Sequence, residues 1–173
     1  MITIIAGTNR PNSNTLKIAK YYQNKLAEKG LETTLLDLQN LPANFVAEDL
    51  YGKKSEAFEK IQQLTTNTSK FLFVIPEYNG SYPGVLKAFI DACAFPESFY
   101  DKKACLVGIS SGKYGNIRGI EHFNGVCAYL HLNVMPLRIH IPYIKQEINE
   151  NGELFMEDTV KFTTQQMDKF LAY

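Results

Sequence analysis

The stretch KFLFVIPEYNGSYPG, from Lys70 to Gly84, decides the fold of this 173-residue chain. After Lys70, apolar residues occupy successive positions up to Ile75 rather than alternate ones. Such a run is typical of a strand in a parallel sheet that helices cover on both faces. Two prolines and an Asn-Gly pair follow directly, so the sequence predicts a buried strand over Lys70–Ile75 that ends in a stiff loop.

Comparable strand-like runs stand on both sides of this stretch, and segments with helical periodicity separate them. The expected strands are Ile2–Ala6, Glu32–Leu38, Lys70–Ile75, Lys103–Ser110 and Asn133–Leu137, and an extension of the last to Ile141 stays open. The expected helices lie around Leu16–Leu26, Phe58–Leu64, Val85–Cys93, Glu121–Leu132 and Val160–Leu171, and Gly30 is expected to end the first. Strands that alternate with helices in this way predict a doubly wound α/β sandwich.

Two stretches, Gln39–Lys54 and Pro142–Glu157, show no periodic pattern. In the second, Asn151-Gly152 predicts a tight turn between two short hairpin strands. We see no internal repeat, low-complexity tract or linker. We therefore expect residues 1–173 to form a single domain, because a chain of this size can bury a core of its own.

Composition argues against several classes of function. Lys+Arg and Asp+Glu both number 18, so no overall charge favours nucleic acid. The first residues lack the basic start and long apolar run of a signal peptide, and no apolar run approaches the roughly 20 residues of a membrane span. We therefore expect a cytoplasmic protein without a membrane partner. Cys93, Cys105 and Cys127 are expected as buried structural thiols, and the histidines show no spacing typical of a metal site.

In an open parallel sheet, ligands bind at the carboxyl ends of the strands, near the point where strand order reverses. The loop after the first expected strand, Gly7–Thr15, combines hydroxyls, the Arg10 guanidinium and the free amides of a helix start. These groups favour a terminal phosphate, because unpaired amides and the helix dipole attract negative charge. Its glycine spacing fits neither a dinucleotide fingerprint nor a nucleoside triphosphatase loop. An ordinary helix N-cap is the alternative interpretation.

The loops after the third and fourth expected strands lie at the same edge of the sheet. Pro76–Gly84 offers rigid amides and aromatic faces, which a planar heteroaromatic ligand needs, although a plain turn with exposed tyrosines is the alternative. Ser110–Asn116 contains two glycines that let a ligand approach the backbone closely.

These segments, GTNRPNS at 7–13, PEYNGSYPGVLKAFID at 76–91 and SSGKYG at 110–115, resemble the NADPH-dependent FMN reductase family. This is the flavodoxin-like branch that includes quinone, azo-dye and chromate reductases. Its pattern reads G-S-x-R-x-x-S, then P-E-Y-N-x-[GS]-x-P-G-x-L-K-x-x-I-D, and the second match is the specific one. The resemblance implies a flavodoxin-like three-layer sandwich, with a five-stranded parallel sheet of order 2-1-3-4-5 and helices on both faces. It also implies non-covalent FMN, with NADPH or NADH as electron donor.

The resemblance implies FMN-binding residues in all three loops. The phosphate would be held by Thr8, Arg10, Ser13, Asn14 and Thr15, the ribityl chain and ring by Pro76, Glu77, Tyr78, Asn79, Gly80 and Ser81, and the other edge of the ring by Ser111, Gly112 and Gly115. Thr8 replaces the usual serine but keeps a hydroxyl. Asn116 stands where some members have a second glycine, which leaves the shape of the third loop open.

The implied activity is transfer of hydride from NAD(P)H to FMN, and of two electrons onward to a small acceptor such as a flavin, quinone, azo compound or metal oxyanion. No side chain needs to act as nucleophile, acid or base, so we assign no catalytic residue and expect Lys87 and Asp91 to be structural. The alternatives are a flavodoxin-type one-electron carrier that acts with a protein partner, and a fold that has lost its flavin. The balanced charge and the absence of tryptophan argue against the carrier.

The resemblance further implies a homodimer or a tetramer. Phe95, Pro96, Phe99 and Tyr100 form an apolar stretch suited to an interface, and packing over the sheet edge is the alternative. No pocket for the ribose phosphate of NADPH is assigned, and Lys113 and Arg118 are its candidate cations.

Overall fold

The computed structural model describes all 173 residues, Met1–Tyr173. Its centre is a sheet in which β2 (Thr33–Asp37), β1 (Ile2–Ala6), β3 (Lys70–Pro76) and β4 (Lys103–Ile109) lie side by side in that order, all parallel. β5 (Asn133–Val134) and β6 (Ile139–Ile141) both pair with β4, again in parallel. The predicted order 2-1-3-4-5 is therefore confirmed, and a sixth strand is added to it.

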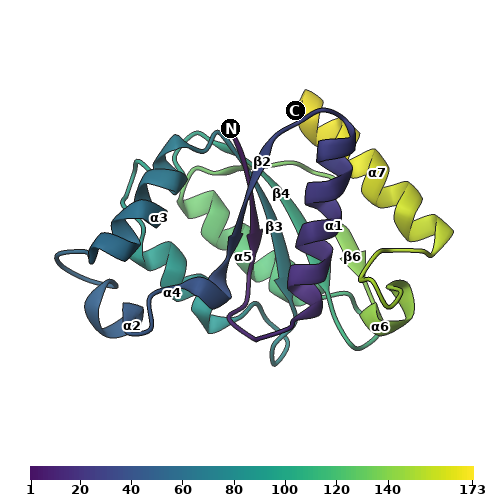
Figure 1. Ribbon diagram of the computed structural model, residues 1–173, viewed down its shortest axis with the longest axis horizontal. Coiled ribbons are helices and arrows are strands. Elements are labelled where there is room, and N and C mark those ends of the chain that lie inside the picture. Colours follow the sequence, from purple (N-terminus) through teal and green to yellow (C-terminus); the bar gives the residue numbers. More distant parts are fainter.

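Helices cover both faces of this sheet (Figure 1). One face carries α1 (Asn14–Glu28) and α7 (Glu157–Ala172), and the other carries α3 (Glu56–Asn67), α4 (Gly84–Ala92) and α5 (Ile117–Tyr129). None of the helices is both long and apolar enough to cross a bilayer. The predicted three-layer α/β sandwich is thus confirmed.

The two cores explain why the strand-like runs lack alternation. In β3, Phe71 and Phe73 enter the core shared with α3, α4 and α5, whereas Leu72 and Val74 enter the core shared with α1 and α7. Since successive side chains of a strand point to opposite faces, both sets must be apolar. All four side chains are fully buried.

The last predicted strand is broken into two. Pro136 lies between β5 and β6, and it has no N–H to continue the ladder along β4. A side chain from α7 fills the break: the buried Gln166 amide donates to the carbonyls of Leu106 and Leu137, both at 3.0 Å. The open question of an extension to Ile141 is thereby answered, since pairing with β4 resumes at Ile139.

Short elements occupy the two stretches without a periodic pattern. The first contains a 3-10 turn at Leu38–Asn40 and α2 (Phe45–Glu48), and the second contains α6 (Ile144–Glu147). The turn at Asn151-Gly152 exists, with Gly152 at φ +81°, but only one bridge, between Ile148 and Leu154, joins its arms. The prediction of two hairpin strands is therefore wrong, because a single bridged pair does not continue into a ladder.

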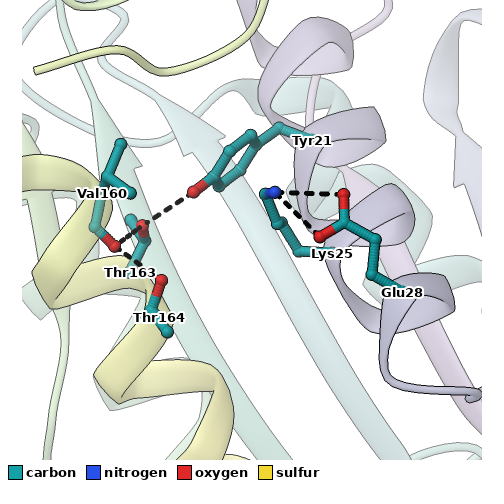
Figure 2. Close-up of polar contacts among 6 residues, drawn as sticks. All are labelled: Tyr21, Lys25, Glu28, Val160, Thr163 and Thr164. Atoms are coloured by element: carbon teal, nitrogen blue, oxygen red, sulfur yellow. Dashed lines mark hydrogen bonds and ion pairs between the residues drawn. The ribbon is translucent and has the colours of Figure 1, made fainter.

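Contacts between α1 and α7 close one face of the sheet (Figure 2). The Tyr21 hydroxyl of α1 lies 3.4 Å from Thr163 Oγ1 of α7, and Thr163 also donates to the Val160 carbonyl at 3.0 Å. On the exposed side of α1, Lys25 forms an ion pair with Glu28 at 2.8 Å. Gly30, at φ +76°, follows the end of α1, as predicted.

Candidate functional site

Three loops meet at the carboxyl edge of the sheet, where β1, β3 and β4 end. Between them lies a main cleft of about 430 Å³, lined by Arg10–Thr15, Pro76–Tyr78, Ile109–Ser111 and, from α6, Ile144 and Lys145. Beside it are two smaller spaces. The loop hollow, about 260 Å³, is lined by Glu77, Asn79, Gly80 and Ser110–Tyr114, and the rim hollow, about 340 Å³, by Glu77, Tyr114, Ile117 and Arg118. Glu77 lines all three, so the three spaces lie next to one another at this edge of the sheet.

One end of the main cleft gathers hydrogen-bond donors and cations that suit an anion. Ser13 caps α1 by accepting from the Leu16 amide at 3.1 Å, which leaves its own hydroxyl proton free to donate. The amides of Asn14 and Thr15 open the helix and have no intrahelical acceptor. Arg10 and Lys145 add two exposed cations, and neither forms an ion pair. Such a donor set fits a phosphate monoester.

Thr8 lies behind this end rather than inside it. Its side chain is fully buried and does not line the cleft. Its hydroxyl lies 2.7 Å from the Tyr78 hydroxyl and accepts from the Arg10 amide at 3.3 Å. Thr8 therefore ties the first loop to the second.

The second loop is a tight turn. The amide of Tyr78 donates to the Ser81 carbonyl at 2.8 Å, and the amide of Ser81 donates back to Tyr78 at 3.0 Å. Asn79 and Gly80 take φ of 51° and 76°, so the predicted positive φ at this pair is confirmed. Neither of their amides donates to a backbone carbonyl, which leaves both available at the edge of the loop hollow.

The third loop is held from inside by Ser110. Its hydroxyl donates to the Gly112 carbonyl at 2.7 Å and accepts from the Gly115 amide at 2.9 Å. The Gly112 carbonyl also accepts from the Tyr143 amide at 3.0 Å, which fastens the loop to the segment before α6. A Cβ on Gly112 would meet nothing within 4 Å, so a ligand has open access to this backbone.

Asn116 fixes the shape that the sequence left open. It is fully buried, takes a left-handed φ of 62° and precedes the first residue of α5. Its side-chain amide donates to the Ile75 carbonyl at 3.0 Å, so it joins the third loop to β3. This left-handed residue ends the loop and lets α5 begin at Ile117, four residues before the predicted start at Glu121.

Besides Thr8, two of the expected binding residues, Ser81 and Gly115, line none of the three spaces. The Ser81 hydroxyl lies 2.9 Å from Nδ1 of His122 on α5. Gly115 is buried against β6, and a Cβ there would lie 2.7 Å from the His140 carbonyl carbon. The other expected residues, Thr8 excepted, line the main cleft or the loop hollow.

Several lining residues were not among the expected FMN contacts. These are Pro11, Asn12, Ile109, Ser110, Tyr114, Ile117, Ile144 and Lys145, together with Lys113 and Arg118, which the sequence analysis named only as candidate cations for the ribose phosphate of NADPH. Ligands bind at the carboxyl ends of the strands in such a sheet, and this rule also applies to Ile144 and Lys145, because α6 follows β6 at the same edge.

Thiol chemistry has no place in this site. All three cysteines are buried, as predicted, and none lines the cleft. Burial raises the pKa of Cys93 and of Cys127 to about 12 and also raises the pKa of Cys105, so the thiols stay protonated.

Elsewhere, Lys87 and Asp91 form an ion pair at 2.8 Å along α4.

A parallel α/β sheet of this strand order, with loops around an open cleft at its carboxyl edge, defines a ligand-binding protein of the flavodoxin-like class. The comparisons with known proteins name the family. Residues 1–145 match the family model described as NADPH-dependent FMN reductase. The chain belongs to this family, and the predicted FMN-dependent oxidoreductase with NAD(P)H as donor is confirmed.

A curated relative and two solved structures agree with this assignment. The relative is a 2-hydroxy-1,4-benzoquinone reductase of Burkholderia, 30% identical over 176 residues, covering 99% of this chain and 94% of its own. The flavoenzyme NAD(P)H:(acceptor) oxidoreductase FerB of Paracoccus denitrificans has a TM-score of 0.83 and 26% identity, covering 99% of this chain and 95% of its own. A flavodoxin mutant of Pseudomonas aeruginosa has a TM-score of 0.62 and 14% identity, covering 99% of this chain and 97% of its own, a likeness of fold alone. The reductase is thus favoured over the one-electron carrier.

Proposed function

We propose that the main cleft and the loop hollow hold FMN, and that a quinone takes the electrons. When bound, FMN accepts a hydride equivalent from NAD(P)H and releases two electrons to an acceptor. The observation that carries the assignment is the convergence of three loops and α6 on one cleft, with cations and helix amides gathered at a single end.

We assign the phosphate to Arg10, Ser13, Asn14 and Thr15, with Lys145 added from α6. Pro76, Glu77 and Tyr78 would line the ribityl chain. The free amides of Asn79, Gly80, Ser111 and Gly112 would donate to the edge of the ring and stabilise negative charge there. Thr8, Ser81 and Gly115 act through the loops they fasten, since their contacts lie outside the cleft.

The choice of a quinone rests on the relatives and on the open side of the site. One relative carries a benzoquinone in its name, and the FerB title leaves its acceptor general. In this chain, Tyr114 is 51% exposed and lines both hollows, so it offers a flat surface for a small ring compound.

The test follows the visible absorbance of protein reconstituted with FMN, without oxygen, while NADPH and then a quinone are added. We expect about one NADPH per FMN to bleach the flavin bands, in keeping with a two-electron transfer, and the quinone to restore them. Steady-state plots at several acceptor concentrations should be parallel, because donor and acceptor use the same open side in turn. Flavin bands that neither NADPH nor NADH bleaches would refute the reductase. Intersecting steady-state lines would refute the use of one open side by both donor and acceptor.

We also infer that residues 1–173 act as one FMN-binding domain and assemble as a homodimer or tetramer. An apolar hollow of about 530 Å³ lies along α4 and α5, and Phe95 and Tyr129 in its lining are 60% and 78% exposed. Phe99, in contrast, is buried, with its ring centroid 5.2 Å from that of Phe71. Light scattering at micromolar concentration tests the assembly, and a monomeric mass refutes it. The cytoplasmic location stays a prediction, which cell fractionation would check.

A further inference from the structure

The charge around the candidate site differs from that of the whole chain. Overall, 18 basic residues balance 18 acidic ones. The main cleft and its two hollows, however, are lined by four cations, Arg10, Lys113, Arg118 and Lys145, and by a single carboxylate, Glu77. Two of these cations, Arg10 and Lys145, belong to the end already assigned to the FMN phosphate. Lys113 and Arg118 lie in the hollows and are not explained by that assignment.

Lys113 and Arg118 are held around one aromatic ring. The Lys113 ammonium lies 4.9 Å from the Tyr114 ring centroid, and the Arg118 guanidinium carbon lies 5.8 Å from it. Both distances are within the range of cation–π attraction. Arg118 also lies against the second loop, because a Cβ on Gly80 would stand 3.7 Å from its Nη1. Contact with Tyr114 and with the turn thus positions the guanidinium at the mouth of the site.

The charge of this pair is available to a ligand. Neither Lys113 nor Arg118 forms an ion pair with any carboxylate, and Glu77 lies in the same hollows without pairing to either. Lys113 and Tyr114 are exposed, as is Arg118. The surroundings therefore offer two cations without an ion-pair partner and a flat aromatic surface beside the proposed ring site.

We propose that Lys113 and Arg118 select redox partners that carry a negative charge, with Tyr114 holding the two cations in place. This inference rests on the proposed function and deepens it. The shared chemistry is an anionic oxygen group on a ligand that also contains a planar ring. Two sources present it: an ionised quinone acceptor, and the extra ribose phosphate that distinguishes NADPH from NADH. An Arg guanidinium suits both, since it binds carboxylate-like and phosphate oxygens in a fixed fork.

The experiment compares the FMN-loaded protein with Arg118→Met and Lys113→Met, singly and combined. Methionine keeps an unbranched apolar stem but removes the charge. The matched control is Lys169→Met, because Lys169 is an exposed cation in the last turn of α7, far from the cleft. The neighbouring Phe170 carbonyl accepts from Lys70 at the amino end of β3, which places this turn at the edge of the sheet opposite the cleft. For each protein, kcat/KM is measured with naphthoquinone sulfonate and with unsubstituted naphthoquinone. Equilibrium binding of NADP⁺ and of NAD⁺ is measured by calorimetry.

We expect at least one of two ratios to fall about tenfold in the double variant, the loss typical of one charge-assisted contact. A fall in the sulfonate-to-neutral kcat/KM ratio identifies the acceptor as the source of the anion. A fall in the NADP⁺-to-NAD⁺ affinity ratio identifies the donor. Lys169→Met should leave both ratios unchanged. If both ratios in the double variant stay within twofold of the unmodified protein, the inference is overturned. Since the unmodified protein must first be reduced by NAD(P)H, failure of the proposed function would show separately.

Discussion

The hydroxyl of Thr8 lies 2.7 Å from the hydroxyl of Tyr78, across 70 residues of sequence. The first residue belongs to the loop after β1 and the second to the loop after β3, so this contact joins the loop proposed for the phosphate to the loop proposed for the ribityl chain and the ring. The Thr8 side chain is fully buried, and a buried hydroxyl without a hydrogen-bond partner lowers the free energy of unfolding. Although Thr8 does not line the cleft, it holds in place a tyrosine that does.

Removing either hydroxyl should therefore weaken both stability and cofactor binding. We expect Thr8→Val and Tyr78→Phe each to lower the free energy of unfolding by about 1 kcal/mol, and the double variant to lose less than the sum of the two. Urea denaturation measures the first quantity, and fluorescence titration of the apoprotein with FMN measures the second. Thr8→Ser, which keeps the hydroxyl, is the control. Additive losses would show that the two hydroxyls are not coupled.

Two glycines of α5 should respond in opposite directions to the same change. A Cβ on Gly119 would collide with Asn116 Oδ1 and lie 2.7 Å from the Ser81 carbonyl carbon, whereas a Cβ on Gly125 would meet nothing within 4 Å. We expect Gly119→Ala to destabilise the fold by about 1–3 kcal/mol through overpacking. Gly125→Ala should stabilise it by about 0.5–1 kcal/mol, because alanine favours a helix interior. Urea denaturation of both variants checks this pair, and shifts of equal sign would contradict it.

The sheet and the three loops could be predicted because their signals are local. The run Phe71–Ile75 is apolar at every position since it serves two cores, and Asn79-Gly80 adopts positive φ because the turn demands it. Position at the carboxyl edge then brought the loops together.

The remaining features depend on contacts between distant segments, which no local pattern reveals. The break in the last strand is accommodated by Gln166, far along the chain in α7. The start of α5 depends on Asn116, whose partner is the Ile75 carbonyl of β3. Lys145 enters the cleft only because β6 carries α6 to the same edge as β1 and β3.

Stability should depend on pH through His140. Burial lowers the pKa of this imidazole, with Arg138 acting in the same direction and the Gly115 carbonyl and Glu121 opposing it. The folded state therefore favours the neutral ring. The contribution of His140 to the free energy of unfolding is fully present above the pKa of the unfolded state, about 6.5. It is lost as the pH falls from there through the lowered pKa of the folded state. His140→Gln should flatten this part of the stability–pH curve measured by thermal unfolding.

The control for His140 is a histidine at the surface. His131 is exposed, and the stability–pH curve of His131→Gln is measured beside that of His140→Gln. An unchanged slope below pH 6.5 in His140→Gln would assign the effect to another group.

Affinity for FMN should depend on the two cations at the helix end of the main cleft. Arg10 lines it from the loop after β1 and Lys145 lines it from α6, and neither forms an ion pair with a carboxylate. We expect Arg10→Met and Lys145→Met each to raise the Kd for FMN about tenfold and to make it less sensitive to salt, because each removes a charge-assisted contact with phosphate. Titration of the apoprotein by flavin fluorescence measures this, with Lys20→Met, an exposed cation farther along α1, as the control. Riboflavin, which has no phosphate, should bind all four proteins alike; if the variants weaken riboflavin and FMN equally, the two cations do not contact the phosphate.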